Sequence, residues 1–162
     1  MTNSNLLAVA SKYGNPLYVY DSEKIASQYQ RLTSAFSSIE NIRINYAAKA
    51  LSNISILKLM RKLGSGLDTV SIQEVKLGLA AGYDPQAIIY TPNGVSLKEI
   101  ETVAKMGVQI NIDNLSLLEQ FGTRNPKIPV CVRINPHVMA GGNSKISVGH
   151  IDSKFGVSIH QI

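Results

Sequence analysis

The sequence has little of what marks a secreted, membrane or nucleic-acid-binding protein. Among its 162 residues Cys131 is the only cysteine, so no disulfide can form within the chain and a reducing compartment is expected. No apolar run approaches the roughly 20 residues that a transmembrane helix needs. The amino-terminal stretch "MTNSNLLAVASKYG" has too short an apolar core for a signal peptide. The sequence therefore predicts a cytoplasmic protein with no membrane partner.

Aromatic residues make up only 6% of the chain, and the net charge of +5 comes from scattered lysines and arginines. A scattered basic excess without a recognised motif is typical of a solvated surface, so nucleic acid is not expected as a partner. The sequence also has no cluster of His, Cys or carboxylate residues at ligand spacing, and no metal site is predicted. Cys131 lies in the apolar run "PVCVRIN", where we expect a small buried residue.

Short apolar runs rich in β-forming residues recur along the chain at intervals of roughly twenty residues. They cover residues 42–47, 66–70, 87–91, 108–113 and 130–135. Amphipathic segments between these runs begin at residues that cap helices, and most of them end at a glycine. The capping residues are Ser52 or Asn53, Ser71 with Glu74, Ser96 with Glu99, and Asn114. This alternation predicts parallel strands joined by right-handed helical crossovers.

Two α/β architectures fit such an alternation, an open doubly wound sheet and a (β/α)8 barrel. No G-x-G-x-x-G follows the first strand, which weakens the dinucleotide-binding version of the open sheet. Five of the barrel's eight units are present, followed by a Gly-rich stretch over residues 136–156. Ser158 and Gln161 then match a capping box that would begin a sixth helix. We interpret the sequence as the N-terminal fragment of a (β/α)8 barrel, which leaves strand edges exposed.

The beginning of the sequence is out of phase with the later units. Residues 15–21, "NPLYVYD", are strand-like, and Asp21 or Ser22 can cap the helix that follows. We predict that residues 1–20 belong to a second domain and that residues 21–162 form the N-terminal part of the barrel.

Polar residues stand at or just after the ends of the predicted strands, where the loops of a parallel α/β fold converge. They are Lys49, Asp68, Asn93, Asp113 and Arg133. The Lys49 amine has two interpretations: it reaches solvent or pairs with an acid such as Asp68, or it lies desolvated near other cations. In the second case the neutral amine attacks a carbonyl group and forms a Schiff base. Both a Schiff-base aldolase and a pyridoxal-phosphate enzyme would use it.

Five motifs in this order resemble those of the decarboxylases of pyridoxal-phosphate fold type III. They are "NPLYVYD", "YAAKA", "GLDTVSIQEVKLGLAAG", "VRINP" and "SKFGV". The resemblance implies an alanine-racemase-like barrel followed by a C-terminal β-domain, to which the N-terminal strand contributes. It also implies pyridoxal 5'-phosphate as the cofactor and a homodimer. The family's phosphate-binding loop, its pyridine-pairing acid and the β-domain would all follow Ile162.

The same resemblance implies roles for single residues. Lys49 of "YAAKA" carries the cofactor covalently, Asp68 lies near that linkage, and Arg133 of "VRINP" lies close to the cofactor. Glu74 matches a glutamate of the family, but it is also the capping-box residue of its helix, and we expect the capping role.

The "SKFG" motif and the histidines are assigned no chemistry. Lys154 and Phe155 are expected to shape their loop. The family's cofactor-stacking histidine belongs to a later segment, so His150 is interpreted as a solvent-facing residue, like His137 and His160.

Within this family the motifs are most similar to those of the diaminopimelate decarboxylases. The resemblance implies decarboxylation of meso-2,6-diaminopimelate to L-lysine and CO2 by the complete protein, with the isolated chain inactive. Carboxynorspermidine, ornithine and arginine decarboxylases share much of the pattern and remain alternatives. A non-catalytic pyridoxal-phosphate-binding homologue is another, and a Schiff-base aldolase would differ from all of these in showing no pyridoxal absorbance.

Overall fold

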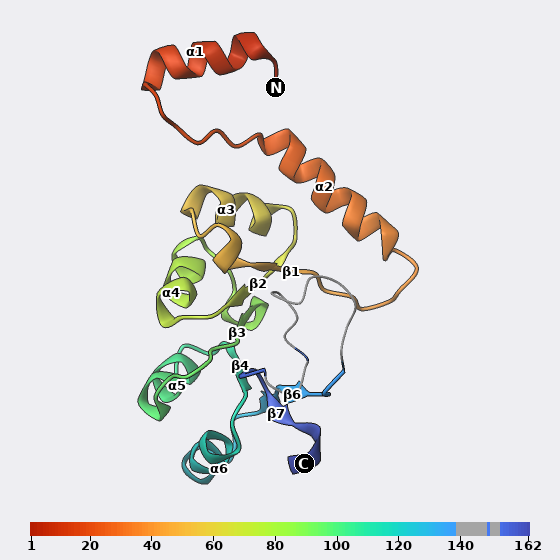
Figure 1. Ribbon diagram of the computed structural model, residues 1–162, viewed down its shortest axis with the longest axis vertical. Helices are drawn as coiled ribbons and strands as arrows, with labels where there is room; N and C mark the ends of the chain where they lie inside the picture. Colours follow the sequence, from red (N-terminus) through yellow and green to blue (C-terminus); the bar gives the residue numbers. More distant parts are fainter. Residues whose placement is uncertain (139–148, 150–152) are drawn as a thin grey trace. The chain divides into compact units, whose positions relative to one another are not determined.

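The computed structural model describes residues 1–138, 149 and 153–162, and the chain divides into two compact units, Met1–Ile42 and Arg43–Ile162. The first unit contains two helices, α1 (Asn3–Tyr13) and α2 (Ser22–Ala35), drawn in red and orange in Figure 1. Neither helix has a buried residue. Helix α1 has no counterpart among the predicted elements, whereas α2 is the helix expected after Asp21.

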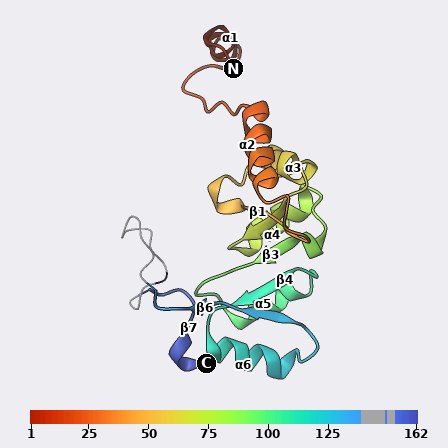
Figure 2. The ribbon, with the colours of Figure 1, turned by 90° about the vertical axis from the view of Figure 1, so that its right-hand side faces the viewer.

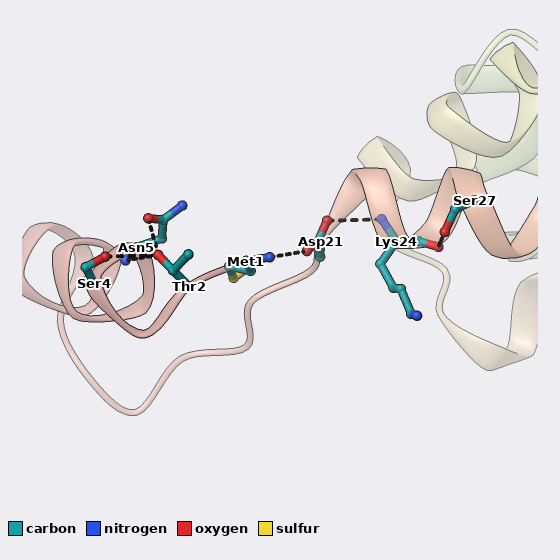
Figure 3. A network of polar contacts seen from close by, with 7 residues as sticks. All are labelled: Met1, Thr2, Ser4, Asn5, Asp21, Lys24 and Ser27. Carbon is teal, nitrogen blue, oxygen red and sulfur yellow. Dashed lines mark hydrogen bonds and ion pairs between the residues drawn. The ribbon is translucent and has the colours of Figure 1, made fainter.

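The N-cap of α2 also binds the amino terminus of the chain (Figure 3). Asp21 Oδ1 accepts a hydrogen bond of 3.1 Å from the backbone N–H of Lys24, and Oδ2 lies 3.2 Å from the Met1 ammonium nitrogen. The Lys24 N–H, followed by the amino terminus, lowers the pKa of the Asp21 carboxyl below its usual range, because both donors stabilise the charged form. Asp21 is therefore the cap, and not Ser22.

The prediction of a strand over residues 15–21 is wrong for the structure described. This segment pairs with no described strand, and most of its side chains are exposed, with Tyr18 at 91%. A strand consists of hydrogen bonds to a neighbouring strand, so a run of apolar and β-forming residues alone does not make one. The assignment of residues 1–20 to a second domain stays a prediction.

The second unit contains a five-stranded parallel sheet. Its strands are β1 (Asn45–Ala47), β2 (Gly66–Thr69), β3 (Ile88–Tyr90), β4 (Gln109–Ile112) and β5 (Val130–Val132). They pair in the order β1-β2-β3-β4-β5, and each pair is parallel. A doubly wound sheet reverses its strand order at a switch point, whereas this order follows the chain without reversal. The order is that of a (β/α)8 barrel and decides between the two architectures.

Four helices connect the strands and lie along one side of them in Figure 1. They are α3 (Ile54–Lys62), α4 (Ile72–Ala80), α5 (Leu97–Ala104) and α6 (Leu115–Arg124). Their N-caps are Asn53, Ser71, Ser96 and Asn114, as predicted, with Asn53 chosen over Ser52. Short 3-10 turns, η1 (Ala48–Ala50) and η2 (Pro85–Ala87), stand beside β1 and β3. Every helix in the described ranges is too short or too polar to span a bilayer.

The core lies between the sheet and these helices. Alternate strand residues point to the helix side and are at most 2% exposed; they include Leu67, Ile88, Tyr90, Ile110 and Ile112. The residues between them, Asp68, Ile89 and Asn111, are half-buried on the opposite face, which Figure 2 brings toward the viewer. This opposite face carries the polar side chains that form the site.

The predicted strand over residues 130–135 divides at Arg133. The Arg133 N–H donates to the Ile112 carbonyl at 2.8 Å, while the Arg133 carbonyl accepts from the Val157 N–H at 2.7 Å. Beyond it, β6 (Ile134–Asn135) pairs with β7 (Val157–Ser158) in a separate two-stranded parallel sheet. Arg133 is therefore the point at which the chain passes from one sheet to the other.

The prediction that Cys131 is buried is wrong. Cys131 is exposed, and its register partner on β4 is Asn111. These two residues lie on the face of the sheet away from the helices, because pairing in register puts neighbouring side chains on the same face. The apolar run predicted a strand correctly but not which side of it the helices cover.

Gly156 lets β7 approach β6. Its φ is +82°, and a Cβ there would lie 2.9 Å from the Asn135 nitrogen and 3.1 Å from the Arg133 oxygen. After β7 the chain forms a 3-10 turn, η3 (Ile159–Gln161), in which Ser158 Oγ accepts from the His160 N–H at 3.2 Å. The described residues thus form a short 3-10 turn here, and not the start of an α-helix that the capping box of Ser158 and Gln161 predicted.

Candidate active site

A pocket of about 510 Å³ opens at the carboxyl ends of the strands. It is lined by Lys49, Asp68, Val70, Thr91, Asn93, Arg133, Lys154 and Phe155. Four of the five strand-end residues singled out from the sequence line it directly. The fifth, Asp113, reaches it through Asn93, whose Nδ2 donates to Asp113 Oδ2 at 2.6 Å. The sequence-based grouping of these five residues is therefore confirmed by the geometry.

Lys49 lies in the turn η1, directly after β1. Ala48 is fully buried, whereas Lys49 is exposed. Of the two interpretations of the Lys49 side chain, this exposure agrees with the one in which the amine reaches solvent. Its position at the pocket, beside other cationic residues, is as predicted.

Asp68, Thr91 and Asn111 form a chain of hydrogen bonds across three neighbouring strand ends. Thr91 Oγ1 donates to Asp68 Oδ1 at 2.9 Å. Asn111 Nδ2 donates to Thr91 Oγ1 at 3.0 Å. Neither Thr91 nor Asn111 belongs to a motif of the sequence, although alternation along β3 and β4 puts both on the face that carries Asp68.

Arg133 packs against an aromatic ring. Its guanidinium carbon lies 4.7 Å from the centroid of Phe155, and the Lys154 ammonium nitrogen lies 5.2 Å from the same centroid. A ring attracts cations to its face, so Phe155 holds both positive groups beside the pocket. Asn93 connects to the same segment, because its Nδ2 lies 3.5 Å from the Lys154 carbonyl oxygen. Lys154 and Phe155 therefore belong to the pocket wall.

Glu74 has the capping role that was expected. Its backbone N–H donates to Ser71 Oγ at 3.3 Å, and its own Oε2 accepts from the Val70 N–H at 2.8 Å. These two bonds satisfy backbone donors at the start of α4. Glu74 is not among the residues that line the pocket.

His137 and His160 are not among the residues that line the pocket. His137 is half-buried, and its ring packs edge-on against His160 with centroids 5.1 Å apart. The interpretation of His137 as solvent-facing is therefore wrong, while His160 is exposed as expected. His150 lies outside the described residues.

The charges of the pocket indicate what it can bind. Lys49, Arg133 and Lys154 are cationic, and Asp68 is the carboxylate among the lining residues. This balance favours an anionic ligand. A primary amine at the wall can also bond covalently to an aldehyde or ketone.

A family model described as "Pyridoxal-dependent decarboxylase, pyridoxal binding domain" matches residues 22–162. The chain belongs to this family. Its pocket suits pyridoxal phosphate, because Lys49 offers an amine to the aldehyde and the cationic residues suit the phosphate. The predicted cofactor therefore follows both from membership of the pyridoxal-dependent decarboxylases and from the residues present.

Curated relatives in this family match nearly the whole chain. It is 37% identical over 156 residues to a diaminopimelate decarboxylase of Methanothermobacter thermautotrophicus, covering 95% of this chain and 36% of that protein. It is 34% identical over 161 residues to a diaminopimelate decarboxylase of Escherichia coli K12, covering 97% of this chain and 37% of that protein. The chain thus spans little more than a third of the length of these relatives.

Solved decarboxylase structures have the same fold. The diaminopimelate decarboxylase of Helicobacter pylori complexed with L-lysine matches with a TM-score of 0.86 at 34% identity, covering 97% of this chain and 41% of that one. The diaminopimelate decarboxylase of M. jannaschii in co-complex with L-lysine matches with a TM-score of 0.82 at 30% identity, covering 96% of this chain and 38% of that one. The prediction of part of an alanine-racemase-like (β/α)8 barrel is confirmed.

Proposed function

We propose that this chain supplies the cofactor-binding lysine and the adjoining strand ends of a diaminopimelate decarboxylase. Such an enzyme converts meso-2,6-diaminopimelate into L-lysine and CO2. The observation that carries the proposal is the convergence of Lys49, Asp68 and Arg133, from three separate motifs, on one pocket. Relatives that bear this name at 30–37% identity, two of them solved with L-lysine, support the choice of substrate.

Other decarboxylases of the fold are less similar to this chain. A lysine/ornithine decarboxylase of Vibrio vulnificus is 24% identical, and an arginine decarboxylase of the Paramecium bursaria Chlorella virus is 19% identical. At these identities the likeness supports the fold alone. Diaminopimelate is therefore the substrate that we propose.

Lys49 would hold the cofactor through a covalent bond at Nζ, give it up to the substrate's amine, and recover it when the product leaves. The cofactor, when bound, withdraws the electrons of the bond that releases CO2. Exposure of Lys49 at the pocket lets both cofactor and substrate reach Nζ.

Asp68 and Arg133 would orient what Lys49 holds. Asp68 supplies a carboxylate that stabilises positive charge on the Lys49 nitrogen. Arg133, packed against Phe155, presents a fixed cation to the anionic groups of cofactor and substrate. Neither role requires a metal ion.

The proposal extends to the complete protein. We expect a homodimer in the cytoplasm, with residues 1–20 contributing to a β-domain and residues 21–162 forming the N-terminal part of the barrel. These expectations rest on the resemblance to the family.

The test is a comparison of substrates with the purified complete protein. Release of CO2 is measured with meso-diaminopimelate, ornithine, arginine and carboxynorspermidine at equal concentration, together with the visible absorbance of bound pyridoxal. The proposal predicts pyridoxal absorbance and the highest kcat/KM with meso-diaminopimelate. Preference for ornithine or arginine would contradict the substrate, and a protein with no pyridoxal absorbance would contradict the whole assignment.

A further inference from the structure

We propose that Thr91 is a positioning residue for Asp68. Its hydroxyl, oriented by Asn111, holds the Asp68 carboxylate in one orientation beside the cofactor linkage at Lys49. This inference rests on the proposed function, because it assigns Thr91 a role at the same pyridoxal site.

The hydrogen bonds around Thr91 have a fixed direction. An amide nitrogen can only donate, so Asn111 Nδ2, at 3.0 Å, uses a lone pair of the Thr91 oxygen. A carboxylate can only accept, so the single hydroxyl proton of Thr91 points to Asp68 Oδ1 at 2.9 Å. The chain therefore runs from Asn111 through Thr91 to Asp68, and each donor reinforces the next.

Thr91 itself is held by the sheet. Its backbone N–H donates to the Thr69 carbonyl at 2.7 Å, so its Cα is fixed relative to β2, the strand that carries Asp68. β-Branching leaves the Thr91 side chain few rotamers. Because Thr91 also lines the pocket, its hydroxyl lies at the edge of the space that the cofactor would enter.

The orientation of Asp68 matters because three cationic residues line the same pocket. The pocket wall that holds this carboxylate also includes the cationic residues Lys49, Arg133 and Lys154. A second carboxylate, Asp113, accepts a hydrogen bond from Asn93. A freely rotating carboxylate could pair with Arg133 or Lys154 and leave the Lys49 nitrogen without its counter-charge. A neutral hydroxyl that fixes one oxygen of Asp68 restricts this choice without adding charge.

The experiment uses Thr91→Val in the complete protein loaded with pyridoxal phosphate. Valine has nearly the same shape but has no hydroxyl. The first readout is the pH at which the visible absorption band of the Lys49-bound cofactor changes. We expect this pH to fall by about one unit, because the protonated nitrogen loses a fixed negative partner. The second readout is turnover, with kcat expected to fall roughly tenfold while KM changes less.

Two further variants separate positioning from a merely structural effect. Thr91→Ser keeps the hydroxyl, so the pH at which the absorption band changes (the spectral midpoint) should equal that of the unmodified protein. Thr69→Val removes a hydroxyl of the neighbouring strand that donates to the Ile89 carbonyl at 2.9 Å and is fully buried on the helix side. It should lower the melting temperature and leave the spectral midpoint where it is. If Thr91→Val does not fold, Asn111→Ala takes its place, with a downward shift again expected.

The inference is overturned if the absorption band of the Thr91→Val protein changes at the same pH as that of the unmodified protein. It is also overturned if the band of the Thr91→Ser protein changes at the lowered pH expected of the valine variant. If Asn111→Ala has to stand in, an unchanged midpoint overturns it equally. These failures leave the proposed function intact as long as the unmodified protein carries pyridoxal on Lys49. An unmodified protein that binds no pyridoxal would contradict the proposed function itself.

Discussion

The phenol of Tyr90 donates a hydrogen bond of 2.6 Å to Oε1 of Glu99 and so joins the end of β3 to the first turn of α5. Tyr90 is 0% exposed. Burial, followed by the bond to Glu99, raises the pKa of the Tyr90 phenol well above its ordinary value of 10.0. The predicted capping box at Ser96 is thus half formed. Ser96 Oγ accepts from the Glu99 N–H at 3.3 Å, while the Glu99 carboxylate binds Tyr90.

The raised pKa of Tyr90 predicts a loss of stability in alkali. The stabilisation is fully present below pH 10.0, the ordinary value, and is lost as the pH rises further, because the unfolded chain then releases a proton that the folded protein retains. Tyr90→Phe should lower the free energy of unfolding near neutral pH by about 1–2 kcal/mol and make its decline above about pH 10 shallower. Urea unfolding at several pH values measures both. Tyr18→Phe, at a residue 91% exposed, is the matched control and should change neither quantity.

Substitution by alanine should have opposite effects on stability at Gly156 and at Gly122. At Gly156 the φ is +82°, and an added Cβ would lie 2.9 Å from the Asn135 nitrogen. Because both features are unfavourable for alanine, Gly156→Ala should lower the free energy of unfolding by roughly 1–3 kcal/mol. At Gly122, within α6, an added Cβ meets nothing within 4 Å. Gly122→Ala should therefore raise stability by up to about 1 kcal/mol. Thermal melts of the two variants check the pair, and equal effects would contradict the account of β6 and β7.

Glu74 should contribute to stability and not to chemistry. Glu74→Gln keeps an acceptor for the Val70 N–H, now 2.8 Å from Oε2, and should cost little stability. Glu74→Ala removes it and should cost about 1 kcal/mol. Neither change should alter the absorbance of bound cofactor. A folded Glu74→Gln protein that fails to bind pyridoxal would show that the carboxylate acts at the site after all.

The cation packed against Phe155 should set the affinity for the cofactor. Arg133→Lys keeps the charge but loses the planar guanidinium that lies 4.7 Å from the ring centroid. The Kd for pyridoxal phosphate should rise roughly tenfold. Phe155→Leu keeps an apolar wall without the ring and should raise the Kd less. Spectroscopic titration measures both, and an unchanged Kd in Arg133→Lys would mean that charge alone suffices.

Local sequence patterns predicted much of this structure. Capping residues such as Asn53 and Asn114 satisfy backbone donors within a few positions of themselves, so the helix starts could be predicted without knowing the fold. The division of the fifth strand at Arg133 could not, because it depends on partners at Ile112 and Val157. The exposure of Cys131 depends likewise on which side of the sheet the helices cover.

The site was predicted in part for the same reason. The strand-end positions of Lys49, Asp68 and Arg133 follow from the alternation of strands and helices along the chain. Thr91 and Phe155 gain their roles only through contacts with residues that the fold brings near, Asp68 in one case and Arg133 in the other. A sequence pattern gives positions on a face, but not hydrogen bonds across it.

The central claim is that Lys49 carries pyridoxal phosphate. The most direct measurement is reduction of the loaded complete protein with borohydride, which fixes the cofactor to its lysine, followed by mass spectrometry of the peptides. The account predicts the pyridoxyl group on Lys49, with Lys154 and the other lysines unmodified and with no modification in a Lys49→Ala control. A pyridoxyl group on another lysine, or none in a folded and loaded protein, would contradict it.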